Sequence, residues 1–443
     1  MWRTMFALYF AIPAFTAGDQ ITESATMPNF ITSDVGRTWL ELLMKREGFK
    51  NDVDVERVTS MSFSPFDPPG VNFGSNRTRV EMTLLLKSCE TVNTSVLVVD
   101  FPDSILRKKQ LHASGLFDRD INVYERILPK MNDFLFNRSN YAKRMWTKAI
   151  DLRRPLRLVL NNVENNGYKR KDKTKGLNME HCKVAVEDLA KFHALSAVLE
   201  SQGEINVEDF DLSLSQRNAK QIGDWYGKVY KEFANSIRAT WGPEWKSAAQ
   251  QIDEKAKTIT EDYLKLLKRD DSKFNALLNG DFTINNLFFN YGCSQEESPP
   301  KSSKVINFQN AFWNSPALDL QLFLNTSPEP EIIMDDSRRD KIITYYASQL
   351  RAFSELYGLK EKIVTVEDIK SEMSRTELVG FSKAMNDLSG IYLKPEDAPY
   401  TEQFIIDALK NKEIRIDSKG MFHPRFIEVM KKLVTRAQTI GII

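Results

Sequence analysis

The stretch LLNGDFTINNLFFN, residues 277–290, gathers the residue types that are best suited to chemistry. A turn-forming Asn-Gly precedes the carboxylate Asp281, and Asn286 follows after four intervening residues. A held carboxylate can act as a general base, and an amide oxygen can contact a divalent cation without adding negative charge. The alternative for Asp281 is structural, because an aspartate in such a loop also caps or braces the backbone. Asp281 and Asn286 are therefore the first candidate site residues.

The histidines and cysteines indicate no competing chemistry. His193 lies in a helical pattern among apolar neighbours, which favours a buried structural histidine over a base. The other histidines are His112, His181 and His423. None of them is paired with a nucleophile, so a hydrolase triad is not supported. The cysteines are Cys89, Cys182 and Cys293. They lack metal-ligand spacing, and they leave either one disulfide or none open.

The composition indicates an ordinary globular protein with one large or two to three smaller domains. Of the 443 residues, 42% are hydrophobic and 27% are charged, so a sizeable core can form. The 61 basic and 60 acidic residues leave a net charge of +1, and no long basic run occurs. We therefore expect no nucleic-acid partner. No apolar run is long enough for a transmembrane anchor.

The first residues are typical of a secretory signal peptide. After Arg3 comes an apolar run that ends at Phe15, and small residues follow up to Gly18. This order predicts that residues 1–18 are removed and that the protein is secreted. The alternative is a cytoplasmic protein in which these residues form an amphipathic N-terminal helix or a helix packed on the domain. If the chain is secreted, its Asn-x-Ser/Thr sequons become candidate glycan sites. The sequons are at Asn76, Asn93, Asn137 and Asn325.

The residue pattern predicts mainly strands in the first part of the chain and mainly helices in the rest. The first part holds short β-rich segments separated by turn residues, and these are residues 55–63, 78–87 and 94–101. Residues 115–131 then predict a helix with one apolar stripe, closed by Pro129. A strand is expected at 156–163, and most of the chain after it has helical periodicity. We expect an α+β protein with a small β-rich lobe over residues 28–155 and a larger helical lobe over 156–443.

Further motifs accompany the loop around Asp281. They are GVNFGSNRTRV (70–80), FDRDINVYERILP (117–129), LAKFHALSA (189–197) and VINFQNAFWNSPALDLQLFL (305–324). With NGDFTINNLFF (279–289), they resemble the ecdysteroid-kinase-like family of insects, which belongs to the choline-kinase-like and aminoglycoside-phosphotransferase-like group. The resemblance covers nearly all of residues 28–443. It implies a bilobal protein-kinase-like fold, with ATP and Mg²⁺ as cofactors if the chain is active.

The resemblance also implies roles for individual residues. Asp281 matches the catalytic base, and Asn279 stands where the family carries a histidine that supports the loop. The matched metal ligands are Asn286 and Asn307, of which Asn307 replaces an aspartate. The matched cofactor-binding positions are Gly70, Asn72, Ser75, Asp100 and Asp120. Asp319 is expected to brace the catalytic loop.

Several of these matches change the charge at the phosphate end. Asp100 is matched to the family's strand lysine, and Asp120 to the glutamate that pairs with it. One charge pair about 4 Å apart contributes roughly 4 kcal/mol at an effective dielectric near 20, so losing the lysine and a metal carboxylate weakens phosphate binding. Arg77 and Arg79 are expected to be solvated, although one basic side chain could replace the lysine from another direction.

Two hypotheses follow. The first is a secreted kinase-fold pseudoenzyme that binds a small apolar ligand, such as a steroid-like alcohol, or an extracellular protein partner. The second is an atypical ATP-dependent phosphotransferase that acts on the hydroxyl of a small molecule such as an ecdysteroid. The retained shape and the lost charges favour the first hypothesis.

Overall fold

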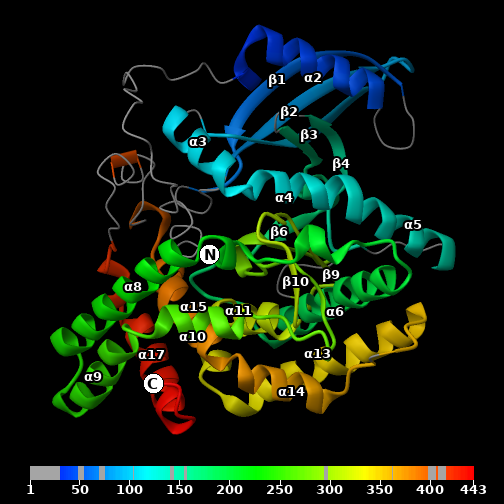
Figure 1. The fold of residues 1–443 in the computed structure, drawn as a ribbon. Coiled ribbons are helices and arrows are strands. Elements are labelled where there is room, and N and C mark those ends of the chain that lie inside the picture. Colours follow the sequence, from blue (N-terminus) through cyan, green and yellow to red (C-terminus); the bar gives the residue numbers. More distant parts are fainter. Residues whose placement is uncertain are drawn as a thin grey trace.

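The chain forms a small lobe built on an antiparallel sheet and a larger, mostly helical lobe (Figure 1). The computed structural model describes residues 30–47, 54–68, 75–102, 104–139, 144–153, 157–293, 298–361, 363–397, 406–407 and 416–443. The expected two-lobed α+β architecture is thereby confirmed. The expected signal peptide and the candidates Gly70 and Asn72 lie outside the described residues.

The small-lobe sheet has the strand order β1-β2-β3-β5-β4. Its strands are β1 (Val55–Pro65), β2 (Asn76–Leu86), β3 (Thr91–Asp100), β4 (Ala149–Arg153) and β5 (Arg157–Asn161). The first three are the strands expected from the β-rich segments. Strand β5 pairs with both β3 and β4, so the sheet continues to Asn161, beyond the lobe boundary expected at residue 155.

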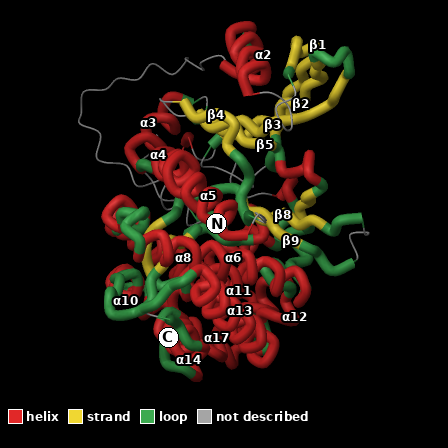
Figure 2. Tube along the Cα trace, turned by 90° about the vertical axis from the view of Figure 1, so that its right-hand side faces the viewer, coloured by secondary structure: helices red, strands yellow, loops and turns green. Residues whose placement is uncertain are grey.

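The two faces of this sheet pack against different partners. Along β3, Val96 and Val98 pack with helix α2 (Asp34–Glu47), whereas Leu97 and Val99 belong to the main core. This follows from the strand period of two, which sends successive side chains to opposite faces. Figure 2 shows α2 on the side of the sheet that points away from the large lobe. Even-numbered positions at this end of β3 therefore face α2, and odd-numbered ones face the cleft between the lobes.

A long helical stretch runs beneath the sheet. It contains α3 (Ile105–Ser114), α4 (Leu116–Asn122), a π-helical turn (Val123–Ile127) and α5 (Leu128–Ser139). The expected apolar stripe is buried. The prediction that Pro129 ends the helix is wrong, because α5 continues to Ser139. Pro129 lies in the first turn after the π-helical turn, where its missing N–H is tolerated.

In the described residues of the large lobe, two small sheets are surrounded by helices. One sheet has the order β6-β8-β9, and the other pairs β7 with β10. The strands are β6 (Tyr168–Arg170), β7 (Ala276–Leu278), β8 (Leu287–Asn290), β9 (Ser302–Val305) and β10 (Phe312–Asn314). The main helices are α6 (Met179–Ser201), α8 (Ala219–Thr240), α9 (Lys246–Lys255), α10 (Ile259–Leu266), α11 (Ala317–Thr326), α13 (Asp336–Tyr357), α14 (Val366–Arg375), α15 (Glu377–Ile391) and α17 (Pro424–Thr439). Short helices are α7 (Leu214–Arg217) and α12 (Pro330–Ile333).

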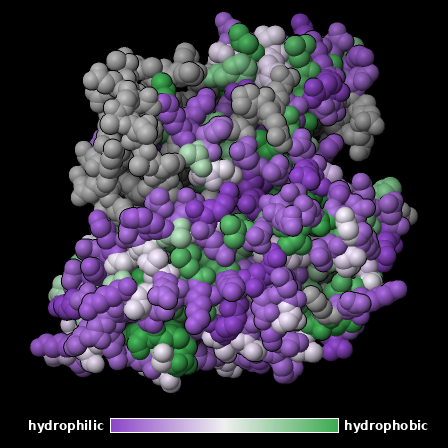
Figure 3. Space-filling model, viewed as in Figure 1, coloured by the Kyte–Doolittle hydropathy of each residue, from purple (hydrophilic) through white to green (hydrophobic). Residues whose placement is uncertain are grey.

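The surface fits a globular protein. The face in Figure 3 is largely hydrophilic, with small separate hydrophobic areas. In the part of the chain that the structure describes, no helix has both the length and the apolar character needed to cross a bilayer. All three cysteines are free, with Cys89 and Cys293 exposed and Cys182 buried.

Candidate functional site

The loop that carries Asp281 begins where buried strand β7 ends. The residues of β7 are fully buried and pair with β10, with Leu278 opposite Phe312. Gly280 then adopts a φ of +73°, and a Cβ atom there would lie 2.0 Å from the carbonyl oxygen of Asn310. Only glycine can meet both conditions, because other residues strain at positive φ and need room for Cβ. The loop is therefore turned sharply, and it closes into a 3₁₀ turn at Ile284–Asn286.

Asp281 lies at the centre of a buried cluster of amides. Its Oδ2 atom accepts an N–H from Nδ2 of Asn307 at 2.8 Å and another from Nδ2 of Asn286 at 3.1 Å. Burial raises the pKa of Asp281 to about 7, although the charge of Lys383 and the Asn286 hydrogen bond oppose the rise. Three of the predicted site residues are thus brought together, and the carboxyl group titrates near neutrality.

Asn279 acts on the backbone of this cluster. Its Nδ2 atom donates to the carbonyl oxygen of Asn307 at 2.7 Å, and its Oδ1 atom accepts the N–H of Asp281 at 3.1 Å. The side chain is fully buried. Asn279 therefore ties the two candidate segments together, a bracing role that needs no ionisable group.

Asp319 of α11 braces the same loop from below. Its carboxylate accepts the N–H groups of Asn279 at 2.7 Å and Gly280 at 2.9 Å. His193 of α6 lies 3.2 Å from Oδ2 of Asp319, and its other ring nitrogen lies 2.6 Å from the hydroxyl of Tyr346. The expected bracing role of Asp319 and the buried structural role of His193 are both confirmed.

Asn307 has a strained backbone conformation. Its φ is +120°, in the region that favours glycine. Such a conformation costs roughly 1–3 kcal/mol and persists only when the surroundings hold it. Here the bonds from Asn279 and to Asp281 supply that restraint. The segment that enters the cleft at Asn307 is therefore held by the amide cluster itself.

Asp120 binds the backbone of the segment that follows Asn307. Its Oδ1 atom accepts the N–H of Phe308 at 2.8 Å, and the neighbouring Arg119 donates to the carbonyl oxygen of Ala311 at 2.8 Å. Burial raises the pKa of Asp120 to about 6, and the Phe308 bond and the charge of Arg77 oppose that rise. Asp120 thus joins α4 to the site through the backbone.

The structure corrects the placement of Asp100. Asp100 lies on the α2 side of β3, where Arg157 donates to it from Nε at 2.9 Å, and the Arg157 guanidinium lies 4.1 Å from the centre of the Phe30 ring. It is not brought together with the other candidates. The cleft-facing residue at this level of β3 is Val99, because side chains alternate between faces.

Arg77 is also corrected, since it is buried and not solvated. It pairs with Val99 across β2 and β3, so it faces the cleft. Its charge acts on Asp120, and its NH1 atom lies 3.5 Å from Oδ2 of Asp67. Ser75, which immediately precedes β2, is buried as well. Sequence reasoning missed Asp67, because nothing in its Pro-rich loop marks it as a charge partner.

The residues present do not fit a magnesium ion. The cluster offers a single carboxylate, and both amides direct their N–H groups toward that carboxylate. Mg²⁺ requires oxygen ligands, so both amides would have to turn, and the site would still supply little negative charge. Among the described residues, no group of three or more His, Cys, Asp or Glu side chains is arranged to hold a metal.

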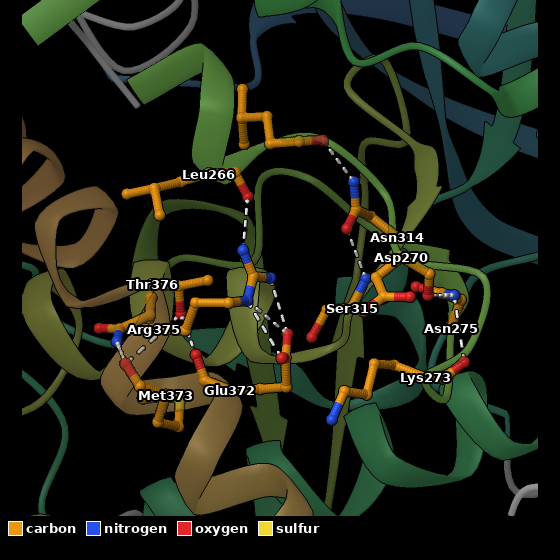
Figure 4. A network of polar contacts seen from close by, with 12 residues as sticks. Leu266, Asp270, Lys273, Asn275, Asn314, Ser315, Glu372, Met373, Arg375 and Thr376 are labelled. Atoms are coloured by element: carbon orange, nitrogen blue, oxygen red, sulfur yellow. Dashed lines mark hydrogen bonds and ion pairs between the residues drawn. The ribbon is translucent and has the colours of Figure 1, made fainter. Parts of the chain in front are cut away.

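A polar network holds the chain that leads into β7 (Figure 4). Asn314 at the end of β10 donates to the carbonyl oxygen of Leu267 at 2.8 Å. Arg375 of α14 donates to the carbonyl oxygen of Leu266 at 3.1 Å and also binds Glu372. These contacts connect the end of α10, strand β10 and α14.

Comparisons with known proteins identify the family of this chain. The model of the ecdysteroid kinase-like family matches residues 69–359. A search of curated proteins finds no match. Among solved structures, a choline kinase from Cryptosporidium parvum has a TM-score of 0.44 at 12% identity, covering 90% of this chain and 93% of that one. An ethanolamine kinase from Plasmodium vivax has a TM-score of 0.39 at 12% identity, covering 86% and 82%. Because the family model spans more than half of the sequence, this chain belongs to the ecdysteroid kinase-like family.

Proposed function

We propose that this protein is a pseudoenzyme of its family, which binds a ligand or partner and does not transfer phosphate efficiently. One observation carries the proposal: Oδ2 of Asp281 is occupied by N–H groups from both Asn286 and Asn307. Phosphoryl transfer depends on positioning and on neutralising phosphate charge with cations and metal ions. In this cluster, amides take the places where charge is needed.

A small apolar alcohol, such as a steroid-like molecule, is the proposed ligand. Beside Gly280 lies a cavity of about 50 Å³, whose wall includes Leu267, Phe312 and Val379 as well as Lys383. Ligand sites of drug-sized molecules have roughly 300–1,000 Å³, so a steroid-sized ligand has to widen this cavity. An extracellular protein partner is the other form of the proposal. Secretion rests on the N-terminal sequence pattern and is tested by N-terminal sequencing of the exported protein.

The decisive experiment measures phosphate transfer from γ-labelled ATP to an ecdysteroid with Mg²⁺ present. We expect the native chain to transfer no more label to the ecdysteroid than an Asp281→Asn control does. The matched gain-of-charge variant combines Asn307→Asp with Val99→Lys, because Val99 and not Asp100 faces the cleft. The proposal would be overturned if the native chain transferred label to the ecdysteroid and the Asp281→Asn variant did not.

The alternative is an atypical phosphotransferase, and one observation favours it. A pKa of about 7 at Asp281 suits a general base that works near neutrality. Under this alternative, the native chain transfers label with a rate that rises through pH 7 as the carboxyl group loses its proton. The same assay, run at several pH values, separates the two functions.

A further inference from the structure

A single carboxylate joins two arginines from different lobes. Asp67, just beyond the end of β1, places Oδ2 3.5 Å from NH1 of Arg77 and Oδ1 2.5 Å from NH2 of Arg170. Arg77 belongs to β2 in the small lobe, and Arg170 belongs to β6 in the large lobe. The three side chains are 8%, 3% and 20% exposed, so this bridge is largely withdrawn from water. It links the lobes directly across the cleft.

The bridge adjoins the candidate site on both sides. Arg170 donates from NH1 to the carbonyl oxygen of Asn285 at 2.8 Å, in the 3₁₀ turn that holds Asn286. On the other side, the charge of Arg77 acts on Asp120. Burial lowers the pKa of Arg170, the charge of Asp67 opposes this, and the charge of Arg77 lowers the pKa further because the two arginines repel one another. Without Asp67, these two largely buried cations would lose the counter-ion that they share.

Phe66, the residue before Asp67, packs between the two lobes. The ring of Phe66 lies 5.9 Å from that of Phe288 on β8, and both rings are almost fully buried. The guanidinium of Arg170 lies 4.8 Å from the Phe66 ring centre and 4.5 Å from that of Phe288. Moving Asp67 away from the arginines would therefore also disturb the Phe66 contacts. The position of Asp67 between the two arginines is thus held by apolar packing as well as by charge.

We propose that Arg77 and Arg170 form an anion-binding site between the lobes, that Asp67 is its internal occupant, and that a phosphate-bearing ligand has to displace it. Guanidinium groups donate hydrogen bonds to carboxylate and phosphate oxygens alike, so a phosphate group can replace the Asp67 carboxylate. This site needs no metal and no chemical step. It differs from the amide cluster, in which neutral groups surround Asp281.

The test uses inorganic pyrophosphate as the probe, without metal, in calorimetric titrations of the full chain. Asp67→Asn keeps the shape of the occupant and removes its charge. We expect this variant to bind pyrophosphate at least tenfold more tightly than the native chain, and the gain to vanish in the Asp67→Asn, Arg170→Gln double variant. Equal or weaker binding by Asp67→Asn would overturn the proposal, as would a gain that persists in the double variant, because the anion would then bind elsewhere.

Hydrogen exchange in the native chain gives a second readout that does not depend on the variants folding. Saturating pyrophosphate should speed amide exchange at Phe66, because the N–H of Phe66 donates to the carbonyl oxygen of Arg77 next to the displaced Asp67. Unchanged exchange there would contradict displacement. Neither experiment involves phosphate transfer. The anion-binding proposal can therefore be wrong while the pseudoenzyme proposal is right, and the pseudoenzyme proposal can be wrong while the anion-binding proposal is right.

Discussion

Asn307 donates an N–H to the carboxylate of Asp281 over 2.8 Å, although 26 positions separate them in the sequence. The contact joins the loop after β7 to the segment before β10, and Asn279 adds a second link between the same two segments. A carboxylate held by amides in a dry site keeps its proton more readily than one held by cations. This relationship underlies the first prediction.

Asp281→Asn should stabilise the protein more at pH 8 than at pH 5. The pKa of Asp281 is raised from 3.8 to about 7 by burial, so between these values the folded chain binds more protons at this group than the unfolded chain. Stability therefore falls as the pH rises through this window, and the neutral variant avoids the loss. We expect its gain in unfolding free energy to be about 2 kcal/mol larger at pH 8 than at pH 5, from urea unfolding. The exposed Asp224→Asn control should change by less than about 0.5 kcal/mol at either pH.

Gly280→Ala should destabilise the protein by about 3 kcal/mol, since it combines backbone strain with a clash. The matched control is Gly203→Ala, because Gly203 has a similar φ of +75° but nothing within 4 Å of an added Cβ. That control should cost only about 1 kcal/mol. Chemical denaturation of both variants measures the difference. Equal losses would show that the approach of Asn310 to Gly280 does not constrain the loop.

Asp319→Asn should destabilise the protein by about 2–3 kcal/mol. Asn279 and Gly280 donate to different oxygens of the carboxylate, and the replacement amide puts an NH2 group in place of one of them, so one buried donor is left unsatisfied. The half-buried Asp253→Asn, which only loses an ion pair with Arg238, serves as control and should cost less than about 1 kcal/mol. Thermal unfolding compares the two variants, and similar losses would remove Asp319 from its bracing role.

Glycan occupancy should follow exposure when the chain is expressed through a secretory pathway. Asn93 and Asn137 are exposed, whereas Asn325 is buried and donates to the carbonyl oxygen of Gln321 at 2.8 Å. A glycan on Asn325 is incompatible with this packing, so we expect modification at Asn93 and Asn137 and none at Asn325 in the folded protein. Mass spectrometry of glycosidase-treated peptides measures this. A glycan on Asn325 in folded, secreted material would contradict the packing of α11.

Local pattern was enough to predict much of this molecule. The strands around Val80 and Val98, the helix that carries His193 and the turn at Gly280 depend on short-range periodicity and on backbone preferences that any reader of the sequence can apply. The family motifs are equally local, which is why Asp281, Asn286 and Asn307 could be named before their geometry was known. The π-helical turn before Pro129 was missed, because the proline is a stop signal in ordinary helices.

What the sequence left open was decided by contacts between distant segments. A shift of one residue along β3 exchanges Val99 for Asp100 at the cleft, and only the assembled sheet shows which of them faces it. Asp67 and Arg170 meet across 103 positions of sequence, and their pairing depends on how the two lobes dock. Charge partners separated in this way have no local pattern, because the folding of the whole chain, and not the residues beside them, brings them within reach.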